Sequence, residues 1–184
     1  MEFSIRKAAI EDAGHITRVH VNSWKTTYQG IVPDEYLASL KIEDRVPRWT
    51  EQLADAEHLI FVAENQQGVC GFIGGGPMRE PIGEYDGELY AIYLLRACQL
   101  CGVGRSLVHT LAENLLARDF KSMAVWVLEA NPAVLFYQAL GATLITQKII
   151  EIAGVRLPEL ALGWPDLKAS LGTRFIAAKD GVAE

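Results

Sequence analysis

Apolar and polar residues follow each other along this chain with two distinct periods. Where apolar side chains recur every three or four residues, the pattern predicts amphipathic helices. Where short apolar runs stand between glycine, asparagine or proline residues, the pattern predicts strands. The expected helices cover residues 11–28, 33–40, 43–54, 103–118 and 132–140, and the expected strands cover residues 3–8, 58–64, 69–74, 89–95, 122–128, 143–152 and 155–163.

The order of these elements bounds the fold. It predicts an α/β (α+β) fold built on one mixed sheet, in which the strands on either side of helix 103–118 are parallel, because a crossover helix joins them. A chain of 184 residues suits one domain with a sizeable core. We place this single domain at residues 1–168. Residues 169–184 show no clear pattern, and we expect this C-terminal tail to be poorly ordered.

Composition excludes several classes of protein. Half of the residues are hydrophobic and 22% are charged, as in ordinary globular proteins. No apolar run approaches the roughly 20 residues of a membrane span, and the first residues, MEFSIRKAAIED, lack the apolar core of an export signal. Three cysteines, an odd number, indicate reduced thiols and a cytoplasmic setting. The net charge is −6 without any lysine/arginine run, so we expect neither nucleic acid nor a membrane as partner.

The stretch 87–104, GELYAIYLLRACQLCGVG, carries the strongest local signal. An apolar run long enough for a buried strand ends in a loop that closes on Gly102-Val103-Gly104 and opens into a helix. The free N–H groups of a first helical turn and the helix dipole favour an anion, so this arrangement is typical of a site for a phosphorylated ligand. The turn lacks the third glycine of a dinucleotide fingerprint and the lysine of a P-loop.

A metal site is not expected. The four histidines show no ligand spacing with carboxylates or cysteines. Cys98 and Cys101 form one C-x-x-C pair, but only Cys70 remains, so the second pair of a structural zinc site is missing. His20 is expected to be a structural histidine, with a position facing a pocket as the alternative.

Two motifs in this order resemble those of the GCN5-related N-acetyltransferases (GNAT family). Residues 99–104, QLCGVG, are similar to the family's Q/R-x-x-G-x-G/A loop between a strand and a helix. Residues 131–137, NPAVLFY, followed by Ala139-Leu140-Gly141, are similar to its asparagine, helix, tyrosine and glycine segment. The resemblance covers roughly residues 3–164. It implies a central mixed sheet with helices on both faces, and an enzyme that moves an acetyl group from acetyl-coenzyme A (acetyl-CoA) to an amine.

The resemblance also implies which residues hold the cofactor. The pyrophosphate is expected on the loop 99–104, and the pantetheine arm along the central strand, where it splays from strand 122–128. Leu100 and Cys101 stand where the family often carries charge, so backbone N–H groups must supply most of the anion contact. The residues implied as cofactor-binding are Ile92, Tyr93, Leu94, Gln99, Leu100, Cys101, Gly102, Val103, Gly104, Arg105, Asn131 and Phe136.

The catalytic residues implied by the resemblance are Tyr137 and Glu88. A phenol with an ordinary pKa near 10 is well matched to protonating a departing thiolate, so Tyr137 is expected to be the general acid. Glu88, at the start of the central strand, is expected to deprotonate the amine. The alternatives for this base are Glu84, Asp86 and Glu129. A backbone N–H near Leu94 is expected to polarise the thioester carbonyl.

The residues that bind the acceptor amine are less well defined by the sequence. Trp24 and Tyr28, four residues apart on one helix face, are expected to contact the acceptor, with simple core packing as the alternative. The acceptor is an amine on a small molecule or a protein, and a homodimer is compatible with the resemblance. Two other functions stay open at this point. One is a non-catalytic acyl-CoA-binding sensor module, and the other is a nucleotide-binding protein that uses the same glycine turn.

Overall fold

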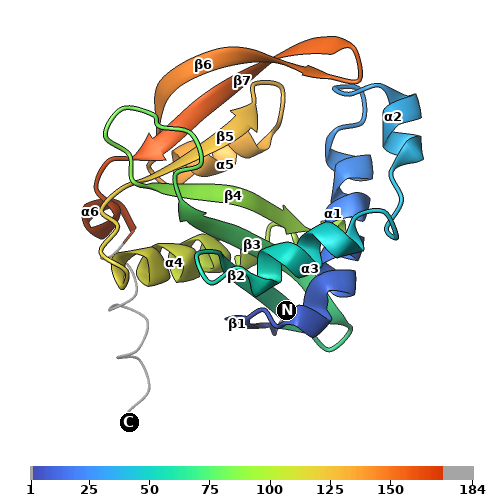
Figure 1. Ribbon diagram of the computed structural model, residues 1–184, viewed down its shortest axis with the longest axis horizontal. Coiled ribbons are helices and arrows are strands. Elements are labelled where there is room, and N and C mark those ends of the chain that lie inside the picture. The colour runs from blue at the N-terminus through green and yellow to red at the C-terminus, as the bar shows by residue number, and fades with distance from the viewer. Residues whose placement is uncertain (1, 172–184) are drawn as a thin grey trace.

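The computed structural model describes residues 2–171. Seven strands form one sheet in the order β1-β2-β3-β4-β5-β7-β6, surrounded by helices (Figure 1). The elements follow the chain as β1 (Ser4–Lys7), η1 (Ile10–Asp12), α1 (Ala13–Thr27), α2 (Asp34–Ser39), α3 (Val46–Ala54), β2 (Leu59–Asn65), β3 (Gly68–Pro77), β4 (Gly87–Leu94), η2 (Arg96–Cys98), α4 (Val103–Leu116), β5 (Met123–Leu128), α5 (Ala133–Ala139), β6 (Thr143–Ile152), β7 (Val155–Trp164) and α6 (Leu167–Leu171).

The pairing of β4 with β5 is the feature that shapes the molecule. These two strands are parallel, as predicted, and α4 connects them. They pair only over Gly87–Leu89 and Met123–Val125, although both strands continue beyond. All other neighbouring strands pair antiparallel. The sheet therefore opens between β4 and β5 at their C-terminal ends, as the resemblance implied.

Helices cover both faces of this mixed sheet, and the expected fold class is confirmed. On one face, the apolar stripe of α4 is fully buried, including Leu107, Leu111 and Leu115. On the other face, α1 packs on β3 and β4 and also contacts α3. There Ile16, Val19 and Trp49 form a second core cluster with side chains of β2 and β3. Burying one stripe of each helix against the sheet supplies most of the hydrophobic stabilisation.

Strand β3 runs three residues further than predicted, through three consecutive glycines to Pro77. At Gly75 a Cβ would lie 2.6 Å from the Glu88 carbonyl oxygen and 2.7 Å from a methyl group of Leu111. Only glycine lets α4 approach the sheet this closely. Gly75, which lies just beyond the strand predicted at residues 69–74, therefore allows close helix packing.

Helix α6 was not predicted. Leu167 and Leu171 are buried in the same core as α4, and the Leu167 N–H donates to the Lys121 carbonyl. The helix spans both sides of position 168, at which we placed the end of the domain. Residues 172–184 of the predicted tail lie outside the described part of the chain.

The β6–β7 hairpin reaches across the molecule toward α2 (Figure 1). Ile150, Ile152 and Leu157 of the hairpin pack against a cluster that includes Leu37 and Leu40. Tyr28 and Leu128 belong to the same cluster. The hairpin therefore closes one end of the opening between β4 and β5. Among residues 2–171, no helix combines the length and apolar character needed to span a bilayer.

Candidate active site

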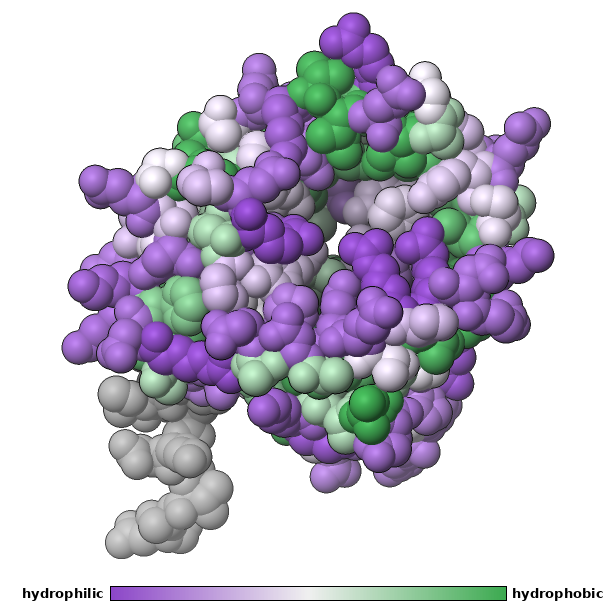
Figure 2. All heavy atoms as spheres, viewed as in Figure 1, coloured by the Kyte–Doolittle hydropathy of each residue, from purple (hydrophilic) through white to green (hydrophobic). Residues whose placement is uncertain are grey.

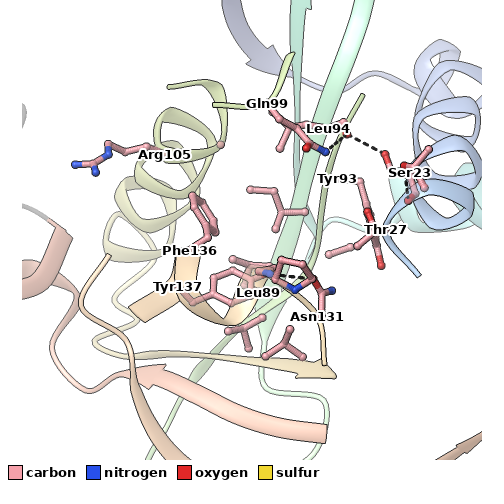
Figure 3. Close-up of a pocket in the computed structure, with 18 of the residues that line it drawn as sticks. Ser23, Thr27, Leu89, Tyr93, Leu94, Gln99, Arg105, Asn131, Phe136 and Tyr137 are labelled. Atoms are coloured by element: carbon pink, nitrogen blue, oxygen red, sulfur yellow. Dashed lines mark hydrogen bonds between the residues drawn. The ribbon is translucent and has the colours of Figure 1, made fainter. Parts of the chain in front are cut away.

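A cavity of about 730 Å³ fills the opening between β4 and β5. Figure 2 shows the molecule hollowed near its centre, with hydrophilic residues around much of the rim. In Figure 3, Phe136 and Tyr137 lie on one side of the pocket, and Ser23, Thr27 and Tyr93 on the other. The cavity brings together these sequence-predicted residues: Tyr28, Ile92, Tyr93, Leu94, Gln99, Leu100, Gly102, Gly104, Arg105, Asn131, Phe136 and Tyr137.

One end of the cavity is formed by the loop before α4. Gly102 is the N-cap of this helix, with φ of +88°, and its carbonyl accepts from the Ser106 N–H. The N–H groups of Val103, Gly104 and Arg105 precede the first intrahelical bond, so they are free to bind an anion. Leu100 also has a positive φ, +60°, and its side chain is fully exposed. The backbone N–H groups of this turn therefore remain the expected anion contacts, and Arg105 points away from Tyr93 and Leu94 (Figure 3).

The open edge of β4 forms the floor of the cavity. The Leu94 carbonyl accepts hydrogen bonds from Ser23 Oγ at 3.1 Å and from Gln99 Nε2 at 3.2 Å. The next residue, Leu95, donates its N–H to the Cys70 carbonyl on β3. Since backbone groups alternate along a strand, the N–H groups of Ile92 and Leu94 face away from β3, toward the open side. These two donors are available to a ligand that lies along β4.

Tyr137 stands where the cavity meets α5. The residue is buried, and its ring contacts those of Phe136 and Trp164. Among residues 2–171, no hydrogen bond engages the Tyr137 hydroxyl. Burial, with a smaller contribution from Tyr28, raises the pKa of this phenol well above its ordinary value. The hydroxyl therefore keeps its proton at neutral pH until a strongly basic group comes next to it.

A chain of hydrogen bonds joins the other end of the cavity across three elements. Trp24 Nε1 donates to the Tyr93 hydroxyl at 2.9 Å, which lies 3.4 Å from the Tyr28 hydroxyl. Asn131 Nδ2 donates to the Tyr28 hydroxyl at 3.3 Å, and Asn131 Oδ1 accepts from the Ala133 N–H. Asn131, two residues before α5, thus binds the first N–H of this helix and connects it to Tyr28 at the end of α1. Trp24 itself does not line the cavity.

Glu88 lies apart from the cavity. Its side chain is 2% exposed, and the backbone N–H, Nε and Nη2 of Arg79 all donate to its carboxylate. The Arg79 guanidinium also lies over the Tyr90 ring, 4.6 Å from its centroid. This carboxylate anchors the loop between β3 and β4, and its contacts give the predicted base role no support.

None of the three alternative bases lines the cavity either. Asp86 accepts hydrogen bonds from the backbone of Lys121 and from the backbone and hydroxyl of Ser122. Glu84 and Glu129 are exposed, and neither lines the cavity. Two predicted cofactor residues also lie outside the lining: the Cys101 thiol donates to the Cys98 carbonyl, and Val103 is fully buried in the core.

His20 has a structural role. Its ring meets those of Trp24, Trp49 and Tyr93, and Trp49 Nε1 lies 3.4 Å from His20 Nδ1. Burial lowers the pKa of His20 to about 3, so it is neutral at physiological pH. In residues 2–171, no cluster of histidine, cysteine or carboxylate side chains has the arrangement of a metal site.

Several lining residues were missed by sequence reasoning. Ser23 and Thr27 of α1, four residues apart, present polar groups to the cavity, and Trp126 of β5 lines it as well. The signal for Ser23 was present, because a polar residue interrupts the otherwise apolar face of the first helix. Trp126 carried no such signal, since a tryptophan in a buried strand is an ordinary core residue.

Comparisons with known proteins agree with this architecture. The family model described as "Acetyltransferase (GNAT) family" matches residues 21–142. The relative named "Uncharacterized N-acetyltransferase YuaI", from Bacillus subtilis (strain 168), is 47% identical over 167 residues, which cover 90% of this chain and 95% of the relative.

Two solved structures show the same fold at lower identity. The yncA protein of Salmonella typhimurium, solved with its cofactor acetyl-CoA, is 21% identical with a TM-score of 0.68, over 91% of this chain and 95% of that one. The PaiA N-acetyltransferase of Thermoplasma acidophilum, in complex with coenzyme A, is 21% identical with a TM-score of 0.64, over 87% and 98%. By its sequence motifs, its family-model match and its 47% identical relative, the chain belongs to the GNAT family and is an N-acetyltransferase.

Proposed function

We propose that this enzyme transfers the acetyl group of acetyl-CoA to an amine by direct attack, with Tyr137 as general acid. The observation that carries the proposal is one cavity that joins a helix N-terminus at one end to an unengaged tyrosine hydroxyl and a polar helix face at the other. Two proteins of the same fold were solved with acetyl-CoA or coenzyme A bound.

The donor would lie across both strands of the opening. Its pyrophosphate binds the N–H groups of Val103, Gly104 and Arg105, where the helix dipole favours negative charge. Its pantetheine arm then runs along the free edge of β4 as an added strand would. This places the thioester near the N–H groups of Ile92 and Leu94, which stabilise the developing negative charge on the carbonyl oxygen.

The acceptor amine would attack from the α1 side of the opening. Its lone pair forms the new C–N bond and the C–S bond breaks. Tyr137 gives its proton to the departing thiolate and takes one back from the nitrogen of the new amide. No acyl-enzyme forms, so holding the amine next to the thioester supplies much of the rate. The acceptor class stays open between small-molecule amines and amines on proteins.

Calorimetry and a thiol-release assay test this proposal together. The pure protein is titrated with acetyl-CoA, and release of the coenzyme A thiol is followed over spermidine, L-lysine, glucosamine and an alanine-initiated peptide. Acetyl-CoA binding together with turnover of at least one amine, confirmed by the product's mass, is the expected result. Binding without turnover of any amine would favour a sensor module, and absence of binding would overturn the proposal.

A further inference from the structure

The acceptor end needs a proton acceptor that the predicted residues do not provide. A lysine-like amine with a pKa of about 10.4 is almost fully protonated at neutral pH and cannot attack in that form. Glu88 and Asp86 are engaged by several donors each, while Glu84 and Glu129 are exposed and lie off the cavity. The carboxylate has to come from another element.

Glu159 of β7 does not line the cavity itself, but it is partly buried and lies beside residues that do. It pairs in register with Leu128 of β5, so both side chains lie on one face of the sheet. Leu128 packs in one cluster with Tyr28, whose hydroxyl belongs to the network around the cavity. On the same face, Trp126 lines the cavity two residues before Leu128. Glu159 thus stands at the α1 side of the opening.

The Glu159 carboxylate is unusually free for a partly buried group. Its side chain is 17% exposed, and its one ion pair in the described residues is with Lys148, at 3.8 Å. No hydrogen bond in the same part of the chain engages its oxygens, in contrast to Glu88. The Lys148 ammonium lies 3.9 Å from the centroid of the Trp126 ring. The same ammonium group also donates to Glu80 Oε2 at 3.4 Å, so an alkylammonium group is already held by this indole and two carboxylates.

Four charged groups, on β6, β4 and the loop between β3 and β4, act on Glu159. Burial raises the pKa of its carboxyl group, Lys148 and Arg79 oppose that shift, and Glu80 and Glu88 add to it. Burial raises the pKa of the Tyr28 phenol, and the charge of Glu159 adds a smaller increase. Burial likewise raises the pKa of Tyr137, and Tyr28 adds to it. Glu159, Tyr28 and Tyr137 therefore interact in series along the acceptor side.

We propose that Glu159 binds the ammonium group of the acceptor, in place of Lys148, and takes its proton before the amine attacks the thioester. The inference rests on the proposed function. One N–H bond of the ammonium breaks and an O–H bond forms on Glu159. The freed lone pair attacks the carbonyl and the C–S bond breaks. Tyr137 protonates the thiolate and takes up the second proton of the nitrogen as the amide forms, and Glu159 returns its proton to water. The fitting acceptor is a primary amine on an aliphatic stem, like the lysine that the site already holds.

Three variants test this assignment with the fastest amine of the panel. Glu159→Gln removes the charge and the base, and kcat/KM for the amine is expected to fall about 100-fold at pH 7, the lower end of what a general base contributes. Its affinity for acetyl-CoA stays unchanged. Lys148→Met keeps the carboxylate and removes its competitor, so activity is retained. Glu151→Gln, an exposed carboxylate on the same hairpin, is the matched control and behaves as wild type.

The pH profile separates a base from a structural ion pair. In wild type, kcat/KM rises to a plateau above the pKa of Glu159, because the enzyme deprotonates the bound ammonium. In Glu159→Gln it keeps rising until solvent deprotonates the amine near pH ~10, so the defect shrinks with increasing pH. In Lys148→Met the plateau begins at higher pH, because losing a nearby positive charge raises the pKa of a carboxyl group.

Each outcome decides the matter. A purely structural pair predicts equal, pH-independent losses in Glu159→Gln and Lys148→Met, and that result would overturn the inference. So would an unchanged kcat/KM in Glu159→Gln, while the proposed function would stand. If wild type turns over no amine, the proposed function fails and this inference fails with it.

Discussion

The two ends of the cavity are built on different principles. At the cofactor end, contacts come from the backbone of one continuous segment: the edge of β4, the loop after it and the first turn of α4. At the acceptor end, contacts come from side chains of α1, β4 and the segment before α5, joined by a chain of hydrogen bonds. The β6–β7 hairpin closes that end from outside.

This difference has a functional consequence. A backbone site recognises features that acyl-coenzyme A donors share, namely a pyrophosphate and an extended arm, and it tolerates changes such as Leu100 and Cys101 in its side chains. A side-chain site changes its preference with each substitution. We therefore expect donor recognition to resemble that of other family members and acceptor choice to be particular to this chain.

Replacement of Tyr137 is expected to have the largest effect, because this residue lies where the two ends meet. Tyr137→Phe removes the proton donor and keeps the ring packing, so kcat should fall at least about 100-fold. Affinity for acetyl-CoA, measured by calorimetry, should stay unchanged. Tyr85→Phe, in the loop outside the cavity, is the control. A kcat near that of wild type in Tyr137→Phe would assign the general-acid role elsewhere.

The acceptor end is also expected to be the acid-sensitive end. The pKa of His20 is about 3 in the folded protein and about 6.5 when unfolded, so the unfolded chain binds this proton more readily. The contribution of neutral His20 to the free energy of unfolding is complete above pH 6.5 and is lost as the pH falls toward 3. At pH 5 the loss is about 2 kcal/mol. His20→Gln, which cannot titrate, should have a lower melting temperature that changes less between pH 7.5 and 5. Parallel slopes in the two proteins would contradict this.

Sequence alone placed most of the loop before α4 on the cavity for a physical reason, whereas cofactor binding there stays a prediction. The turn at Gly102, the first turn of α4 and the strand before them are contiguous, so the motif 99–104 specifies the site locally. The parallel pairing of β4 and β5 followed from the crossover helix, and the structure confirms it. The predicted end of β3 lies three residues too early, because its glycines indicate the start of a loop. The need for glycine at Gly75 arises from a helix that lies over it, which the local sequence does not show.

The acceptor end was not predictable to the same extent. Glu88 occupies the position at which the resemblance implies a base, but whether a carboxylate is free depends on Arg79, nine residues earlier in a loop. Glu159 carried no local signal, because its neighbours Lys148 and Leu128 meet it only through strand pairing. Side-chain sites assembled from distant segments are fixed by tertiary contacts, which spacing along the chain does not report.

A smaller effect is expected where one hydroxyl of the acceptor network is removed. Tyr93→Phe leaves the Trp24 indole N–H without its partner, which costs about 1–2 kcal/mol and lowers the melting temperature by a few degrees. KM for the amine should rise, while acetyl-CoA affinity stays the same, because the cofactor end does not use this hydroxyl. Tyr36→Phe, on the neighbouring helix, is the matched control. Weakened acetyl-CoA binding in Tyr93→Phe would mean that the two ends are coupled.

The smallest effect should come from a pair of glycine substitutions at the cofactor end. Gly102 has a φ of +88°, in which a Cβ costs about 1 kcal/mol, although the space around it is open. Gly102→Ala should therefore lower both the melting temperature and the acetyl-CoA affinity, as the N–H groups of the turn move to relieve the strain. Gly104→Ala, within α4, adds a methyl group at 3.4 Å from Phe136 of α5, an ordinary contact, and should be nearly neutral. If both substitutions weaken acetyl-CoA binding equally, the space around the turn matters more than its backbone conformation. The contrast between a cofactor end built from backbone and an acceptor end built from side chains would then be wrong.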